Sequence, residues 1–231
     1  MRGFTLVELA VVMIIVSLLL GGVILSLTAQ QDIRQTTAAQ QQLAEAREAV
    51  LGFAMVSGRL PCPAKPDVAS GVVGAGSEDC SLSMGVVPWA ALGLAETDPW
   101  GRRLTYRVTS SFRDLISANT VTPPGSCGTL PAFSSFALCS EGNITITDGV
   151  IDIATKVPAV IVSHGRNGRG AYLPTGTQVA GAAGDEAENA DNDGIFVSHT
   201  PTPTPAEFDD LVVWTPLAIT LSRMVAAGKL P

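Results

Sequence analysis

The chain has 231 residues, 46% of them hydrophobic, and a net charge of −7 from 14 Lys and Arg against 21 Asp and Glu. The chain has no overall excess of positive charge that would bind phosphate groups, which argues against nucleic acid as a partner. Only two histidines are present, and neither has a recognisable nucleophile motif beside it, so we do not expect an enzyme. Beyond a long first helix, enough chain remains for one domain with its own core.

The amino-terminal segment starts Met1-Arg2-Gly3-Phe4-Thr5-Leu6-Val7-Glu8-Leu9, and no charge follows before Leu27. The 19 residues from Leu9 to Leu27 are enough, at ~1.5 Å per residue, to cross a hydrocarbon core of ~30 Å as a helix. A secretory signal peptide would carry its small-residue cleavage site after the apolar run, whereas Gly3 precedes it. Glu8 lies at one edge of this segment, where an ionised carboxylate is costly unless it is paired, so it is a functional candidate. The alternative is an interfacial Glu that reaches headgroup water.

Gly3-Phe4-Thr5-Leu6-Val7-Glu8-Leu9 resembles the prepilin cleavage and methylation motif of type IV pilins and type II secretion pseudopilins. The resemblance implies that prepilin peptidase cuts between Gly3 and Phe4 and N-methylates Phe4. It also implies that Glu8 pairs with the terminal amine of a neighbouring subunit during filament assembly. The physics agrees, because an amine and a carboxylate attract far more strongly in a low dielectric than in water. One departure is Gly21-Gly22, since many major pilins carry a proline in this part of the helix.

The predicted division of the chain follows from this segment. Good helix formers, without Pro or Gly, fill residues 23–51, so the apolar helix is expected to continue into the periplasm. Leu43, Ala46, Val50 and Phe53 recur at helical spacing and predict a stripe that a globular domain covers. The parts are a leader peptide at 1–3, a transmembrane helix half at 4–27, a periplasmic helix half at 28–57, and a globular pilin-like β domain at 58–231.

The pattern of the remaining residues predicts short strands joined by loops. The resemblance implies an α+β, pilin-like fold, in which the long helix packs on an antiparallel β-sheet with loop insertions. Asp98-Pro99-Trp100-Gly101 predicts a turn and is similar to the segment that opens the sheet in major pseudopilins. Residues 62–85 are expected to be a loop, with a short helical piece at 86–89 and a turn at 122–125. Strands are predicted at 104–108, 143–147, 157–163 and 207–214, and a final helix at 217–230.

The four cysteines, Cys62, Cys80, Cys127 and Cys139, all follow the apolar helix. An even number in an exported domain predicts disulfides, and four allow three connectivities. We favour Cys62–Cys80 and Cys127–Cys139, because each pairing closes a short loop. Zinc is the rival interpretation, but no CxxC motif or His partner lies near these cysteines.

An acidic run occupies residues 185–193, where Asn189, Asp191 and Asp193 alternate before Gly194. This spacing mimics the first half of an EF-hand, but Thr200 stands where the last ligand would be Glu, so a true EF-hand is not expected. In major pseudopilins a similar loop holds calcium and precedes an Asp-containing strand that closes on Trp, as Trp214 does here. The resemblance implies Asp191, Asp193, Asp209 and Asp210 as calcium ligands. A solvated acidic loop is the alternative.

The sequence therefore predicts a structural subunit of a bacterial type IV pilus or type II secretion pseudopilus. Its implied partners are other pilin or pseudopilin subunits, prepilin peptidase and the inner-membrane assembly platform. Its implied location is the inner membrane, as a single-pass protein with a periplasmic domain, and after assembly a periplasmic or extracellular filament. The alternative is a membrane-anchored periplasmic binding module that does not polymerise and has no need of Glu8. The helix predicted at 217–230 departs from many pseudopilins, which end soon after the Trp.

Overall fold

The computed structural model describes residues 5–114 and 134–230, apart from the side chains of residues 19–29. Its helices are α1 (Leu6–Ser57), α2 (Trp89–Leu92), α3 (Ser110–Arg113), α4 (Asp185–Glu188) and α5 (Leu217–Ala226). Its strands are β1 (Met84–Val86), β2 (Thr105–Val108), β3 (Ile144–Thr147), β4 (Asp152–Val157), β5 (Ala159–Ser163), β6 (Ile195–Val197) and β7 (Leu211–Thr215). The chain divides into two units, Met1–Ala38 and Ala39–Pro231, and α1 runs through the boundary.

The first unit contains the amino-terminal part of α1. The large apolar side chains described between Leu6 and Leu18 are 43–88% exposed. Among the described residues, no helix combines the length and the hydropathy that crossing a bilayer requires. The transmembrane half predicted at 4–27 includes residues outside that description, so it stays a prediction.

The carboxy-terminal end of α1 lies where the sequence predicts it. Ser57 is the last helical residue, and Gly58 follows with a φ of 77°. The Gly58 N–H donates to the Ala54 carbonyl at 2.8 Å. A glycine in the left-handed region satisfies one of the last carbonyls of a helix, and Pro61 then prevents the helix from continuing.

One face of this end of α1 belongs to the core of the second unit. Leu43, Ala46 and Val50 are 3%, 0% and 0% exposed, as their helical spacing predicts. Phe53 is only partly buried, and Ala54 occupies the next core position instead. The stripe therefore keeps a helical period but is shifted by one residue at its last step.

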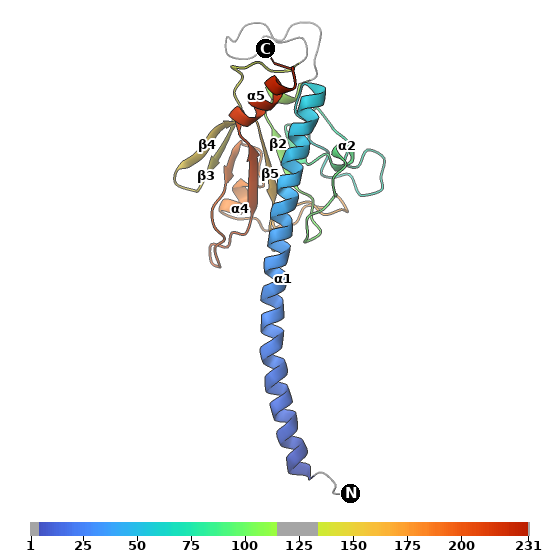
Figure 1. The fold of residues 1–231 in the computed structure, drawn as a ribbon, viewed down its shortest axis with the longest axis vertical. Helices are drawn as coiled ribbons and strands as arrows, with labels where there is room; N and C mark the ends of the chain where they lie inside the picture. Colours follow the sequence, from blue (N-terminus) through green and yellow to red (C-terminus); the bar gives the residue numbers. More distant parts are fainter. Residues whose placement is uncertain (1–4, 115–133, 231) are drawn as a thin grey trace. The chain divides into compact units, whose positions relative to one another are not determined.

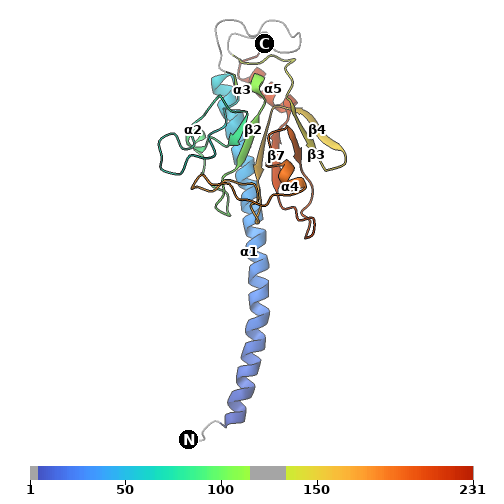
Figure 2. The same ribbon diagram turned by 180° about the vertical axis from the view of Figure 1, so that it is seen from behind.

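The strands of the second unit form two sheets. The first is antiparallel, with the order β1-β2-β5-β7, and the second has the order β4-β3-β6, in which β3 and β6 are parallel. Tyr106 and Ile161 pack with the buried face of α1, whereas Val160 and Val162 on the alternate face of β5 pack with the second sheet. The second unit is thus α+β in three layers, with the first sheet between α1 and the second sheet (Figures 1 and 2).

The turn predicted at Asp98-Pro99-Trp100-Gly101 is present and is held by the Asp98 side chain. Asp98 Oδ1 accepts hydrogen bonds from the N–H groups of Trp100 and Arg102, each at 3.0 Å. Its other oxygen accepts the Ser163 hydroxyl at 2.7 Å, so the turn is tied to the end of β5. An Asp that bonds its own following backbone in this way favours a turn and here also sets the entry to β2.

The strand predicted at 157–163 is divided between the two sheets. β4 ends at Val157 and β5 begins at Ala159, so the chain changes sheet at Pro158, whose ring nitrogen cannot donate to a ladder. The single sheet expected from the sequence is therefore two sheets. β1 begins in the loop predicted at 62–85, α4 lies in the acidic run, and β6 lies in a segment for which the sequence predicts no element. Elements of three or four residues have no readable periodicity.

The helix predicted at 217–230 is α5, which ends at Ala226 before a short folded tail. Met224 and Leu230 are 0% and 5% exposed and join the core cluster that contains the α1 stripe. Arg223 Nη2 also donates to Glu48 Oε2 of α1 at 3.1 Å. The turn predicted at 122–125 lies outside the described residues.

Candidate functional site

The motif at the start of the chain is described from Thr5 onward, so Gly3 and Phe4, the predicted processing residues, lie outside the described residues. The Thr5 N–H and hydroxyl both donate to Glu8 Oε2 at 3.4 Å. In return the Glu8 N–H donates to Thr5 Oγ1 at 3.3 Å. This reciprocal pattern is a capping box, in which the two side chains satisfy amide groups of the first helical turn.

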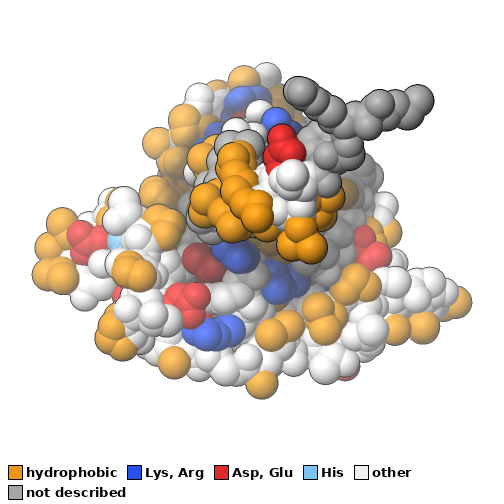
Figure 3. Space-filling model, turned by 90° about the horizontal axis from the view of Figure 1, so that it is seen from below, with side chains coloured by type: hydrophobic (Ala, Val, Ile, Leu, Met, Phe, Trp, Pro, Cys, Tyr) orange, Lys and Arg blue, Asp and Glu red, His pale blue; other side chains and the backbone are white. Residues whose placement is uncertain are grey.

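The capping box gives Glu8 a defined position at the amino-terminal end of α1. A carboxylate there is favoured by the partial positive charge of the helix start. Figure 3 looks toward this end of α1 and shows hydrophobic side chains around it. Leu6, Val7 and Leu9, which flank Glu8 in sequence, are 88%, 71% and 56% exposed. A polar group held among exposed apolar side chains is suited to a contact made in a non-aqueous setting.

The sequence prediction identified Glu8 but not the part played by Thr5. The signal was present, because Thr-x-x-Glu before an apolar run is the sequence signature of a capping box. Thr5 therefore supports the candidate carboxylate without being one of the predicted site residues.

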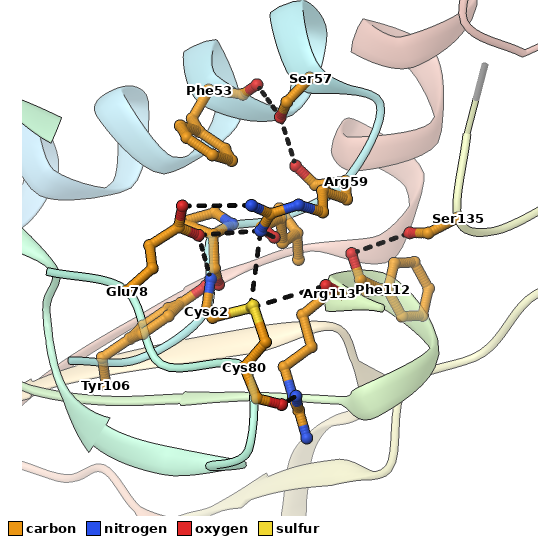
Figure 4. Close-up of polar contacts among 12 residues, drawn as sticks. Phe53, Ser57, Arg59, Cys62, Glu78, Cys80, Tyr106, Phe112, Arg113 and Ser135 are labelled. Atoms are coloured by element: carbon orange, nitrogen blue, oxygen red, sulfur yellow. Dashed lines mark hydrogen bonds and ion pairs between the residues drawn. A yellow bond between two sulfur atoms is a disulfide. The ribbon is translucent and has the colours of Figure 1, made fainter. Parts of the chain in front are cut away.

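The predicted disulfide Cys62–Cys80 is present, and it lies in a polar junction at the end of α1 (Figure 4). Arg59 forms a two-point ion pair with Glu78, with nitrogen–oxygen distances of 2.8 and 3.1 Å. Glu78 Oε1 also accepts the Cys62 N–H at 2.6 Å. The Arg59 guanidinium lies 5.1 Å from the centroid of the Phe53 ring, within the range of a cation–π contact.

The junction continues into the first sheet. The Tyr106 hydroxyl, on β2, donates to the Pro61 carbonyl at 3.1 Å, and burial raises the pKa of Tyr106 well above its usual value. Arg113 of α3 donates to the Cys80 carbonyl. The helix end, the disulfide loop and β2 are therefore fastened at one place. Among the described residues no cysteine is free, but Cys127 lies outside them, so the pairing Cys127–Cys139 stays a prediction.

Three carboxylates meet beside α4. Glu186 comes from α4, and Asp209 and Asp210 immediately precede β7; one oxygen of each lies within 4.8 Å of the others. The Asn167 side chain donates to Glu186 Oε1 at 2.5 Å, and its backbone N–H donates to Asp209 Oδ2 at 2.9 Å. Asn189 Nδ2 donates to Asp210 Oδ2 at 2.9 Å. We call Glu186, Asp209 and Asp210 the acidic cluster.

The acidic cluster has buried oxygens without donors. Among the described residues, Glu186 Oε2, Asp209 Oδ1 and Asp210 Oδ1 are buried and accept no hydrogen bond. Arg169 Nη1 lies 3.7 Å from Glu186 Oε2. Burial raises the pKa of Glu186, against the Asn167 hydrogen bond, and the charges of Asp210 and Asp209 raise it further. Burial likewise raises the pKa of Asp209, with the charge of Asp210 adding to the increase.

These observations test whether the residues fit a calcium ion. Buried carboxylate oxygens without donors are costly, and crowding them together adds like-charge repulsion. Calcium takes oxygen ligands and would satisfy both conditions. Asp209 and Asp210 of the predicted ligand set therefore fit a cation, together with Glu186, which the sequence prediction did not include.

The other two predicted ligands belong to a different group. Asp191 and Asp193 have oxygens within 4.8 Å of each other and of Glu188, in the loop between α4 and β6. Both aspartates are exposed, and both charges act on Arg107. The structure thus divides the four predicted ligands into two pairs, and it brings only Asp209 and Asp210 into a buried cluster. Calcium itself stays a prediction.

Comparison with known proteins bears on the amino-terminal segment. Residues 1–24 match the model of a family described as the prokaryotic N-terminal methylation motif. No curated protein and no solved structure matches the chain. The matched residues include Gly3, Phe4, Thr5 and Glu8, the residues on which the resemblance to pilins rests. The match shows that the chain carries the amino-terminal methylation motif, and it supports the resemblance of this segment to type IV pilins and pseudopilins.

Proposed function

We propose that the chain is a structural subunit of a type IV pilus or type II secretion pseudopilus filament, assembled through its amino-terminal helix. The observation that carries the proposal is the methylation motif at residues 1–24, with a single carboxylate, Glu8, held at the start of a helix whose apolar side chains are exposed. A subunit of this kind works by packing such helices together, so its function requires no catalytic group.

Glu8 is proposed to set the register of assembly. Cleavage after Gly3 would create a cationic amine at Phe4, close in sequence to Glu8. Within the part of one subunit that the structure describes, the Glu8 carboxylate accepts long hydrogen bonds from Thr5. In an apolar filament core, pairing with the amine of a neighbouring subunit would remove the cost of two isolated charges. Every subunit can form this amine–carboxylate pair with its neighbour only if the helices stack in one register.

Before assembly the subunit is proposed to reside in the bacterial inner membrane, with residues 4–27 spanning the bilayer and the second unit in the periplasm. The inner-membrane platform and other pilin-like subunits would be its assembly partners. The Cys62–Cys80 disulfide supports this location, because disulfides persist in oxidising compartments. The pilus and the pseudopilus are told apart by which process stops when the gene is deleted, pilus formation or protein secretion.

The first test replaces Glu8. Glu8→Val should abolish filament assembly, measured by shearing and quantifying filaments, while the protein still accumulates in the membrane. Glu8→Asp keeps the charge and should retain part of the assembly. The matched control is Glu45→Val, which removes an exposed carboxylate from the second half of the same helix and should assemble normally.

Normal assembly or secretion by the Glu8→Val subunit would contradict the proposal and favour a membrane-anchored binding module that does not polymerise. Processing has its own measurement, since mass spectrometry of the cellular protein should give an amino terminus at methylated Phe4. Intact Met1 on the mature protein would exclude processing by the peptidase at this site.

We also propose that the acidic cluster binds calcium and so fastens α4 to the segment before β7. Titration calorimetry of the full chain in detergent micelles should show heat of binding, and calcium should raise the melting temperature. Glu186→Gln with Asp209→Asn should remove both effects, whereas Asp191→Asn with Asp193→Asn should not. If the second variant lost the heat of binding and the melting shift equally, the ion would lie in the exposed loop. If the wild type gave no heat at millimolar calcium, the proposal would be wrong.

A further inference from the structure

A surface strap, residues 198–208, joins β6 to the acidic cluster. Its exposed part, from Thr200 to Ala206, contains the Thr-Pro repeats. The strap closes on itself through two backbone hydrogen bonds, from Thr202 N–H to Phe208 O at 2.9 Å and from Phe208 N–H to Thr202 O at 3.1 Å. Phe208 is 1% exposed and anchors the far end.

His199 holds the near end of the strap through three contacts. Its ring stacks on Phe208 with centroids 3.9 Å apart and planes at 29°. Nε2 lies 3.0 Å from Asp185 Oδ2 on α4, and Nδ1 lies 2.8 Å from the Thr200 carbonyl oxygen. The face of the His199 ring and both of its nitrogens therefore make contacts at the same time.

The chemistry of these contacts decides the protonation of the ring. A backbone carbonyl and an ionised carboxylate can only accept hydrogen bonds, so each ring nitrogen must carry a proton to make both contacts. Neutral imidazole has one N–H and would lose one of the two. The observed geometry is therefore that of an imidazolium.

Two negative charges act on His199 from other elements, and Asp210, before β7, lines the same cavity. Asp185 lies on α4, and Asp148 lies in the turn between β3 and β4; both act on the ring as negative charges. Partial burial by itself lowers the pKa of His199, but the Thr200 and Asp185 hydrogen bonds and these two charges outweigh it, so the pKa is raised.

The strap also borders a cavity of about 250 Å³ between α1 and β7. Its lining includes Ser198, His199 and Asp210, together with apolar side chains of α1 and β7, namely Leu43, Leu211 and Val213. Movement of His199 would therefore change the lining of this cavity as well as the position of the strap.

We propose that His199 is a pH-sensitive clasp: as imidazolium it holds the strap against α4 beside the cavity, and on losing a proton it releases the strap. The direction follows from linkage. A histidine whose pKa is raised on folding stabilises the closed strap fully below the pKa of the unfolded chain, about 6.5, and this contribution is lost as pH rises through the folded value. The strap should therefore be closed in mildly acidic conditions and loosen toward alkaline pH.

The presence of only two histidines makes the clasp directly measurable. NMR of the full chain in detergent micelles, with labelled histidine rings, should show two ring systems between pH 5 and 9. The His199 signals, assigned by their loss in His199→Gln, should titrate above the ordinary value with both nitrogens protonated at pH 6. Asp185→Asn should lower that midpoint by about half a unit to one unit, and Asp67→Asn, the same charge change in another exposed loop, should leave it unchanged.

Hydrogen exchange measures the strap itself. After correction for the intrinsic pH dependence of exchange, the Thr202 and Phe208 amides of the wild type should lose protection about tenfold between pH 6 and 9. In His199→Gln the protection should be low and independent of pH, with the melting temperature of the domain nearly unchanged. A His199 midpoint at or below 6.5, or protection in the wild type that does not vary with pH, would overturn the proposal.

Discussion

The two parts of α1 differ in what covers their apolar side chains. Between Leu6 and Leu18 the large apolar side chains are 43–88% exposed, whereas Leu43, Ala46 and Val50 of the same helix are at most 3% exposed. Helix propensity is adequate in both parts, so propensity does not distinguish them. The two parts differ in the apolar surface that they bury, and each Å² of buried apolar surface stabilises the folded state by about 25 cal/mol. The second part is covered within its own domain, whereas the described side chains of the first part are exposed in the single chain.

The largest expected effect comes from placing a charge in each part. Val50→Asp puts a carboxylate at a position with 0% exposure in the apolar core cluster and should destabilise the domain by at least about 4 kcal/mol, because a buried charge without a partner is costly. Val11→Asp should leave the melting of the domain unchanged, since Val11 is 49% exposed. Tryptophan fluorescence follows melting cleanly, because Trp89, Trp100 and Trp214 all lie in the second unit. Equal destabilisation by both variants would mean that the two parts do not unfold independently.

The next effect concerns the loop that follows the end of α1. Cys62→Ser with Cys80→Ser removes a bond that spans 18 residues and should cost about 3 kcal/mol through the freedom returned to the unfolded chain. In a domain of this size that is roughly 6–12 °C in melting temperature. Differential scanning calorimetry in micelles measures it, and an unchanged melting temperature would show that the polar junction alone fastens the helix end.

The smallest expected change in stability comes from removing one carboxylate from each of two ion pairs. Glu78→Gln weakens three hydrogen bonds at the largely buried junction with Arg59 and should cost about 1–2 kcal/mol. Glu141→Gln breaks the pair with Lys156, whose side chains are 53% and 57% exposed, and should cost at most about 0.5 kcal/mol. Chemical denaturation of both variants gives the comparison. A larger cost for Glu141→Gln would contradict the role assigned to the junction.

Much of the helical and local turn structure could be predicted because its signals lie within a few residues of one another. Gly58 and Pro61 mark the end of α1, the period of Leu43, Ala46 and Val50 marks its buried face, and Asp98 marks its turn. β1, β6 and α4 could not be predicted in the same way. All three are short. β1 and β6 form because neighbouring strands, and for β6 also the Asn189 side chain, satisfy their backbone groups.

The sequence by itself determined the amino-terminal motif, because the motif is defined by the spacing of Gly3, Phe4 and Glu8 along the chain, and contacts elsewhere in the chain do not alter that spacing. The pairing of Cys62 with Cys80 was only favoured by the sequence, because it closes a short loop, and the structure contains it. Only the tertiary structure decided the acidic cluster, the division of the strands between two sheets, and the contacts of His199. Glu186 and Asp209 are far apart in sequence, and the folded positions of α4 and the segment before β7 bring their carboxylates together. The same folding packs the first sheet against the buried stripe of α1 on one face and against the second sheet on the other, so the stripe is covered within the domain.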